Sequence, residues 1–180
     1  MSTLETLLEE PRRLLEGVIN PVITPFINGK IDEQGLVKVI DYSVDEGVAA
    51  LFLLGHTGEF EHLSMEMKKR IIELGIIMRR TGVKIIAGTS GNNLQETVEL
   101  SKYAEEKGVD AIVLAPQFRT TLNPVDYIKL IAENISAPIA IYNNPGICEG
   151  RAVLIERIGE LLSNEKYKKR IIGVKDSSSD

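Results

Sequence analysis

Lys175 is the side chain of this sequence best placed to form a covalent bond with a substrate. It follows the apolar run Ile171–Val174, which predicts a lysine at the end of a buried strand. Burial disfavours the ammonium, lowers the pKa of the amine and frees it for attack on a carbonyl carbon. A lysine at a strand end can also be exposed or paired with a neighbour such as Asp176. Lys175 is therefore a candidate for imine formation with a carbonyl substrate.

Tyr142 also ends an apolar run, and its phenol could move a proton close to an imine. The alternative is a core tyrosine whose hydroxyl group has a hydrogen-bond partner. His56 is either a general acid or base or a polar residue of a turn, whereas His62 is expected at the surface. Cys148, the one cysteine of the chain, is expected to be a buried or half-exposed residue rather than a nucleophile.

The segment Gly55–Glu59 (GHTGE) is a candidate binding turn because glycines stand on both sides of its polar residues. The backbone N–H groups of such a turn can face outward and bind a carboxylate, with the hydroxyl of Thr57 as a further donor. The other interpretation is a tight turn that requires a positive φ. The segment Gly88–Gly91 (GTSG) is a similar but less well supported candidate. Neither segment matches a Walker loop or a spaced GxGxxG, which argues against a nucleotide site.

These candidate residues stand after short apolar runs that recur along the chain. The runs begin roughly 30 residues apart, which is the length of a strand followed by a crossover helix. They are apolar at odd and even positions alike, as in strands buried on both faces. In a parallel sheet the carboxyl ends of the strands lie on one face, where α/β active sites form. The predicted strands are Val18–Ile23, Val48–Leu54, Val83–Ala87, Ala111–Ala115, Ile139–Tyr142 and Ile171–Val174.

The segments between the strands carry the signals of amphipathic helices. Four begin with a side chain that can accept a hydrogen bond from the first helical turn: Asp32, Ser64, Asn93 (with Glu96 in capping-box spacing) and Asn123 (before Pro124). The first three are predicted to end at glycines: Gly47, Gly82 and Gly108. A fifth helix is predicted from Leu154, Ile155, Ile158 and Leu162, and residues 1–16 suggest a short additional helix.

Six consecutive βα units allow either an open doubly wound sheet or a closed (β/α)8 barrel. Periodicity alone does not separate the two folds. Six strands fit the open sheet better, because a barrel needs eight strands and typically about 250 residues. The chain of 180 residues contains neither a linker nor a low-complexity segment, so residues 1–180 are predicted to form a single domain.

Composition excludes several classes of function. The net charge of −5 gives no sign of a nucleic-acid partner. No apolar run reaches the ~18 residues of a membrane span, and Met1–Glu10 lacks the order of a signal peptide. A single cysteine excludes an internal disulfide and a CxxC metal site. The chain is expected to be a cytoplasmic protein.

In order and spacing, the motifs of this chain resemble one family, that of dihydrodipicolinate synthase and N-acetylneuraminate lyase, which includes 2-keto-3-deoxygluconate aldolases. The resemblance runs from about Gly17 to Asp180. It implies an α/β fold of the (β/α)8 (TIM) barrel type, incomplete here, with about six βα units and strands seven and eight missing from a C-terminally truncated chain. The motifs that carry it are Thr24-Pro25-Phe26, Gly55-x-Thr57-Gly58-Glu59, Leu63-Ser64, Gly88-Thr89, Tyr142-Asn143-x-Pro145 and Gly173-Val174-Lys175-Asp176.

The resemblance also implies roles for individual residues. Lys175 matches the lysine that forms an imine with pyruvate or another 2-keto acid, and Tyr142 matches the tyrosine that handles protons there. Thr57, with the backbone of the turn around Gly58 and beside His56, matches the site of the keto-acid carboxylate. The implied partners are a small keto acid and an aldehyde, with no metal or organic cofactor. The implied assembly is a homo-oligomer, a tetramer in this family.

Three departures from the family pattern bear on the reaction. His56 stands where members usually have a threonine or serine of a proton relay, and Gln117-Phe118 stands where the relay tyrosine is expected. The arginine that binds aspartate semialdehyde in the synthases is missing near Ile147, and Arg151 stands further along the chain. An aldolase of 2-keto-3-deoxy sugar acids is therefore the leading hypothesis. The alternatives are 4-hydroxy-tetrahydrodipicolinate synthase and a catalytically inactive, truncated family member.

Overall fold

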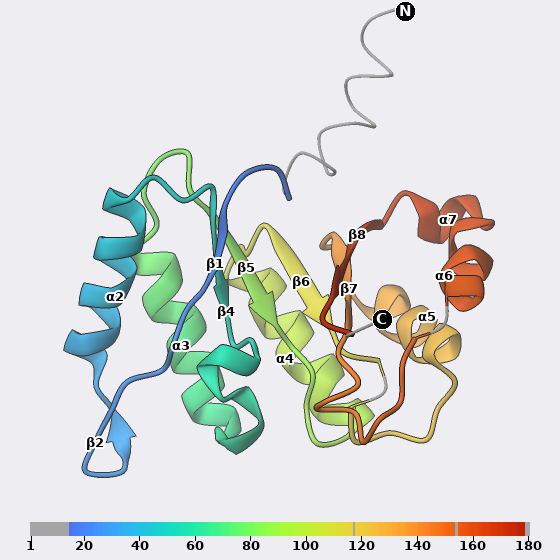
Figure 1. Cartoon of the computed structure of the whole chain (residues 1–180), viewed down its shortest axis with the longest axis horizontal. Helices are drawn as coiled ribbons and strands as arrows, with labels where there is room; N and C mark the ends of the chain where they lie inside the picture. Colours follow the sequence, from blue (N-terminus) through green and yellow to red (C-terminus); the bar gives the residue numbers. More distant parts are fainter. Residues whose placement is uncertain (1–14, 117, 154, 179–180) are drawn as a thin grey trace, which may run out of the picture.

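The six predicted strands are present and form one parallel sheet (Figure 1). The computed structural model describes residues 15–116, 118–153 and 155–178, so most of the helix suggested for residues 1–16 lies outside the described residues. The strands are β1 (Ile19–Pro21), β4 (Ala50–Leu53), β5 (Lys84–Gly88), β6 (Ala111–Leu114), β7 (Ile139–Asn143) and β8 (Ile171–Asp176).

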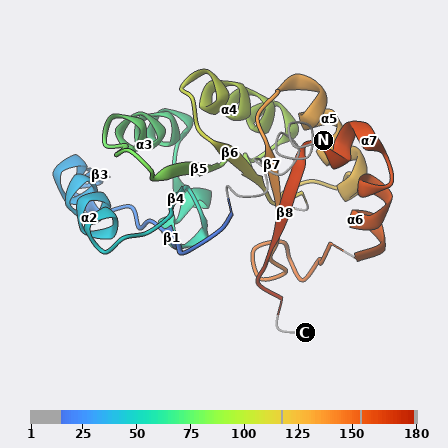
Figure 2. The ribbon, with the colours of Figure 1, turned by 90° about the horizontal axis from the view of Figure 1, so that it is seen from above.

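The order of the strands separates the two folds that periodicity left open. The sheet runs β1-β4-β5-β6-β7-β8, so each of its strands lies beside the strand of this sheet that follows it along the chain. A doubly wound sheet reverses its order at a switch point, and this sheet has no reversal among its described strands. The strands lie on the inner side of an arc of helices (Figure 2), as in part of a barrel wall.

The helices begin where the capping residues predict. Each of the four predicted N-cap side chains accepts a hydrogen bond from a backbone N–H of the first turn. The glutamate of the expected capping box, Glu96, binds the N–H of Asn92 rather than that of Asn93. The helices are α2 (Glu33–Asp45), α3 (Met65–Ile77), α4 (Leu94–Glu106), α5 (Pro124–Asn134) and α6 (Ile155–Leu162).

Helix α3 ends at Ile77 and not at Gly82, where its end was expected. Gly82 lies instead in the turn before β5, with a φ of 88°. The arginines of this turn bind carboxylates of neighbouring elements: Arg79 binds Asp110 and Arg80 binds Asp41. The turn is therefore anchored to the wall of the barrel and does not prolong the helix.

Five short elements of the described residues were not predicted. A hairpin pairs β2 (Phe26–Ile27) with β3 (Lys30–Ile31) in antiparallel fashion. Two 3₁₀ turns, η1 (His56–Gly58) and η2 (Phe60–His62), follow β4, and α7 (Glu165–Lys168) precedes β8. The hairpin and the 3₁₀ turns lie at the carboxyl ends of the strands, which is the lower side of Figure 1.

The core lies between the sheet and the helices. Every residue of β4, β6 and β7 is buried, which agrees with strands covered on both faces. Leu36 and Ile40 of α2 are fully buried and belong to the same hydrophobic core. The outermost strands differ, because β1 has no buried residue and Val174 of β8 is 44% exposed.

We expect a polypeptide of residues 1–180, purified alone, to associate or aggregate. Strands β1 and β8 end the described sheet, and the open backbone of an edge strand pairs readily with other chains. Exposed apolar side chains such as Val174 add to this tendency. Light scattering and thermal unfolding would measure it. A monomer with one cooperative transition and rapid adduct formation with pyruvate would contradict the expectation.

Candidate active site

Lys175 and Tyr142 are opposite one another in the pairing of β8 with β7. Nζ of Lys175 lies 3.9 Å from the centroid of the Tyr142 ring, which is a cation–π contact. Nζ also donates a hydrogen bond of 3.0 Å to Oγ of Ser177. The expected alternative partner, Asp176, accepts hydrogen bonds from Asn143 and Ser178 instead. The structure therefore brings together the two side chains that the sequence singled out for imine chemistry.

Tyr142 is buried, with 5% of its surface exposed. Its hydroxyl oxygen accepts a hydrogen bond of 2.7 Å from Nδ2 of Asn144. The ring meets Phe52 of β4 edge to face, with 6.4 Å between the centroids. Tyr142 thus has the satisfied hydroxyl of a core tyrosine, and its ring also lies under the amine of Lys175.

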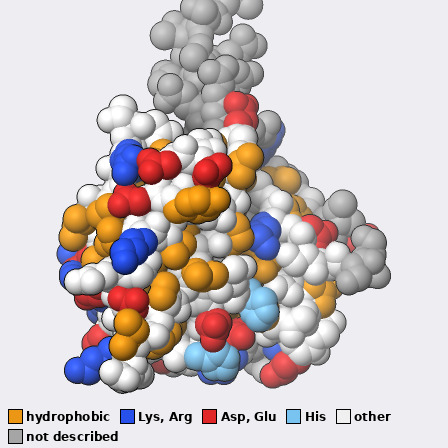
Figure 3. All heavy atoms as spheres, turned by 60° about the vertical axis from the view of Figure 1, so that its left-hand side comes forward, with side chains coloured by type: hydrophobic (Ala, Val, Ile, Leu, Met, Phe, Trp, Pro, Cys, Tyr) orange, Lys and Arg blue, Asp and Glu red, His pale blue; other side chains and the backbone are white. Residues whose placement is uncertain are grey.

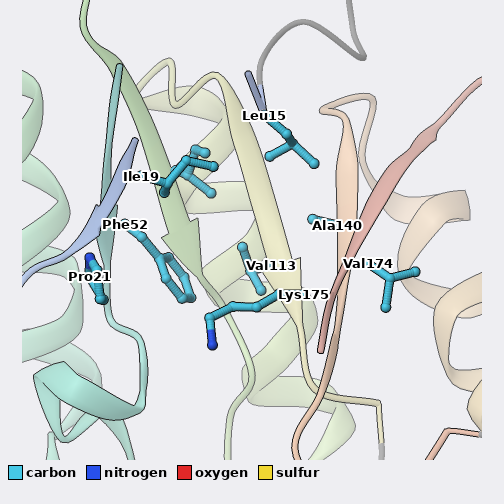
Figure 4. Close-up of a pocket in the computed structure, with 9 residues that line it drawn as sticks. Leu15, Ile19, Pro21, Phe52, Val113, Ala140, Val174 and Lys175 are labelled. Carbon is cyan, nitrogen blue, oxygen red and sulfur yellow. The ribbon is translucent and has the colours of Figure 1, made fainter. Parts of the chain in front are cut away.

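A cavity of about 290 Å³ opens beside Lys175 on the inner face of the sheet. Figure 4 shows the lysine reaching from β8 toward Phe52, with Val113 of β6 beside it. Lys175 is half-buried, so its removal from water is partial and less complete than the sequence predicted. Lys175 is the charged residue in a lining that is otherwise apolar: Leu15, Ile19, Pro21, Phe52, Ile86, Val113, Ala140 and Val174.

The turn Gly55–Glu59 is held against the end of β1. Oγ1 of Thr24 donates a hydrogen bond of 2.8 Å to the carbonyl of Gly58. A Cβ atom on Gly58 would lie 2.9 Å from the carbonyl oxygen of Val22, closer than real Cβ contacts. The positive φ angles fall on Leu54 and Glu59 and not on the glycines. Close approach, rather than a positive φ, is therefore the reason for glycine at this position.

The polar side chains of this turn point to the surface. His56 and Thr57 are exposed, whereas Gly58 is buried. Nδ1 of His56 lies 3.5 Å from Oε1 of Glu61, which also lies 3.7 Å from Nε2 of His62. Figure 3 shows both histidines at the surface beside acidic side chains. Among the described residues, no hydrogen bond or ion pair joins Thr57 to Lys175, so their shared role in one site stays a prediction.

An aromatic pair occupies the place where the relay tyrosine was expected. Phe118 is buried and packs on Phe60 of η2, with 4.9 Å between the ring centroids. Gln117 lies outside the described residues. The phenyl ring of Phe118 has no hydroxyl group, so this position cannot pass a proton.

Lys68 is a buried amine that the sequence reasoning missed. It lies on α3 with 2% of its surface exposed, and its Nζ is 5.7 Å from the centroid of the Phe60 ring. Burial lowers the pKa of Lys68, while the charge of Glu96 acts in the opposite direction. Its position three residues before the buried Ile71 was the available signal, since that spacing places both on one helical face.

A family model described as the dihydrodipicolinate synthetase family matches residues 14–180. The chain belongs to this family. It is 34% identical over 174 residues to the 4-hydroxy-tetrahydrodipicolinate synthase of Bartonella bacilliformis, covering 93% of this chain and 57% of that protein. It is 33% identical over 170 residues to YagE of Escherichia coli K12, a putative 2-dehydro-3-deoxy-D-gluconate aldolase, covering 91% and 54%.

The solved structures of this family confirm the fold. The structure of YagE in complex with pyruvate aligns with a TM-score of 0.85 and 32% identity, over 93% of this chain and 56% of that one. The described residues are therefore six strands of a (β/α)8 barrel, as the resemblance implied. The chain spans little more than half the length of the curated relatives that it matches.

Two other kinds of feature, membrane-spanning helices and metal sites, are absent from the described residues. Among the described residues, no helix has both the length and the apolar character needed to cross a membrane. Within the same ranges, no three side chains of His, Cys, Asp or Glu gather as metal ligands would.

We expect Gly58→Ala to destabilise the protein by about 1–3 kcal/mol, because the added methyl group must displace the turn from β1. Gly159→Ala is the matched control, since a Cβ there meets nothing within 4 Å and alanine favours the helix by up to about 1 kcal/mol. Urea unfolding of the two variants would measure both effects. Equal midpoints would show that β1 does not constrain the turn.

Proposed function

We propose that the protein is a class I Schiff-base lyase that makes or breaks a carbon–carbon bond next to a 2-keto acid such as pyruvate. The observation that carries this proposal is the amine of Lys175 over the ring of Tyr142, beside an apolar cavity. Membership of a family that includes synthases and a putative aldolase supports it.

The proposed reaction begins with the neutral amine of Lys175. The amine attacks the C2 carbonyl of the keto acid, and the resulting carbinolamine takes up a proton and loses water to give a protonated imine. The imine accepts electrons from C3, so that C3 loses a proton and an enamine forms. In the cleavage direction the C3–C4 bond breaks instead, the C4 hydroxyl loses its proton and an aldehyde leaves. Tyr142 is the group proposed to take up and return these protons, and hydrolysis restores the amine.

We propose the loop around Thr57 as the site of the keto-acid carboxylate. The N–H groups of Gly58 and Glu59 already bind the carbonyls of Gly55 and His56 within the turn. The remaining donors are the hydroxyl of Thr57 and the N–H groups nearer the start of the turn. A carboxylate bound there would be held by neutral donors.

The proposed aldehyde partner is a sugar-derived aldehyde, as in a 2-keto-3-deoxy sugar acid aldolase, rather than aspartate semialdehyde. The position near Ile147 offers no arginine. The guanidinium of Arg151 donates to the carbonyls of Thr120 and Cys148, at 2.6 Å and 3.1 Å. These bonds hold Arg151 against the loop after β6.

We expect borohydride reduction in the presence of pyruvate to leave one adduct, on Lys175, which peptide mass spectrometry would locate. Lys68 is the informative competitor, because burial lowers its pKa although it does not line the cavity at Lys175. Lys175→Arg should abolish the adduct and Lys68→Arg should retain it. An adduct on Lys68 or Lys84 would refute the assignment, and no adduct would favour an inactive family member.

We expect the protein to turn over aspartate semialdehyde poorly. Loss of a charge-assisted hydrogen bond to its carboxylate is worth roughly 1.5–3 kcal/mol, or about one to two orders of magnitude in kcat/KM. Coupled assays with pyruvate would compare the semialdehyde with glyceraldehyde and with the cleavage of sugar-acid aldols. Efficient turnover of the semialdehyde would favour the alternative, a 4-hydroxy-tetrahydrodipicolinate synthase.

A further inference from the structure

Asn144 is the residue that contacts the reactive end of Tyr142. Its Nδ2 lies 2.7 Å from the phenolic oxygen, and only 8% of the residue is exposed. The two residues are separated by one position at the end of β7, where the strand enters the loop to α6. The hydrogen bond is therefore formed in a buried place, where a polar contact is stronger than in water.

The backbone fixes which end of the Asn144 amide faces the tyrosine. The N–H of Gly146 donates a hydrogen bond of 3.1 Å to Oδ1 of Asn144. A backbone N–H can only donate, so the amide oxygen must face Gly146. The NH2 group must then face Tyr142, and the phenolic oxygen must accept.

The loop that carries Asn144 is itself held by hydrogen bonds. The carbonyl of Pro145 accepts from the N–H of Gly150 at 2.8 Å, and the carbonyl of Asn144 accepts from that of Ile147 at 3.3 Å. The preceding Asn143 binds elsewhere, to Asp176 and to the N–H of Val153. Asn143 therefore ties the strands and the loop together, whereas Asn144 is directed at Tyr142.

The phenolic oxygen of Tyr142 accepts a hydrogen bond from Asn144 and does not donate one to it, which affects the chemistry of the phenol. Because the oxygen receives a hydrogen bond from Asn144, its own hydrogen does not point at the amide and can be given to another acceptor. When that proton leaves, the donated hydrogen bond stabilises the negative charge on oxygen. An amide has no titratable proton of its own at this position, so it orients the phenol without relaying protons.

We propose that Asn144 is a positioning residue that holds Tyr142 as a proton donor and acceptor, an inference that rests on the proposed function. The two relay positions of the family are unsuited to this task here. Phe118 has no hydroxyl group, and the side chain of His56 is 53% exposed and lies next to Glu61. Asn144 supplies the contact from the loop that directly follows β7, the strand that carries Tyr142.

The test is the exchange of pyruvate methyl protons with deuterium from D2O, which reports enamine formation without an aldehyde. Asn144→Val should slow exchange about tenfold, the equivalent of one hydrogen bond. Asn144→Asp keeps the shape and the bond to Gly146 but cannot donate when ionised, so it should also slow exchange. The exposed Asn134 provides the control. The Asn134→Val and Asn134→Asp variants should catalyse the exchange of pyruvate protons at the rate of the unchanged protein.

A double-mutant cycle separates positioning from a merely structural role. Tyr142→Phe alone should slow exchange, and adding Asn144→Val to it should cause no further loss. The pyruvate concentration at half-maximal rate and the final amount of borohydride adduct should change less than twofold in the Asn144 variants.

Other results would contradict either the role of Asn144 or the proposed function. Exchange at the unchanged rate in Asn144→Val, or an equal further loss in the Tyr142→Phe background, would overturn the role of Asn144 and leave the proposed function standing. Unchanged protein that forms neither an adduct nor exchanged pyruvate would overturn the proposed function, and the role of Asn144 with it.

Discussion

The register between β7 and β8 decides which side chains meet at the candidate site. Ile139 pairs with Ile171, but the next residue of β7, Ala140, pairs with Gly173, because the register shifts at this point. Without this irregularity Tyr142 would be opposite Val174, and Lys175 would lie on the other face of the sheet. One additional residue in β8, Ile172, thus directs the amine to the inner face, beside Tyr142 and the cavity.

Most features that depend on neighbouring residues were predicted correctly, with the hairpin as the exception. Features that depend on distant elements were not predicted. The N-caps were right because capping depends on a side chain and the next few N–H groups. The hairpin of β2 and β3 was missed although Asn28 and Gly29, both with positive φ, form the usual two-residue hairpin signal. The end of α3 depends on ion pairs with other elements, and the shift in β8 depends on a partner strand. Neither can be read from a local window.

The candidate site shows the same division. That Lys175 and Tyr142 lie at the same end of the sheet followed from the rule that the ends of parallel strands share one face, whereas their direct pairing depends on the register shift in β8. The partial exposure of Lys175 depends on how much of the barrel surrounds it, which the sequence of one strand does not contain. Asn144 stood at the variable place of the Tyr-Asn-x-Pro motif, and only the geometry of the loop gives it a partner. The burial of Lys68 was missed because the buried face of α3 was assigned from its apolar residues alone, without its charged ones.

The sequential order of the strands also has a consequence for how the chain folds during its synthesis on the ribosome. Each strand of the six-stranded sheet pairs with the strand of that sheet synthesised before it, so every new βα unit can dock on a surface that already exists. Chain entropy lost at each docking step is that of one crossover connection, and domains fold as the N-terminal part emerges. Strand β8 is the last of the six to emerge, so the other five strands can be assembled before Lys175 joins them.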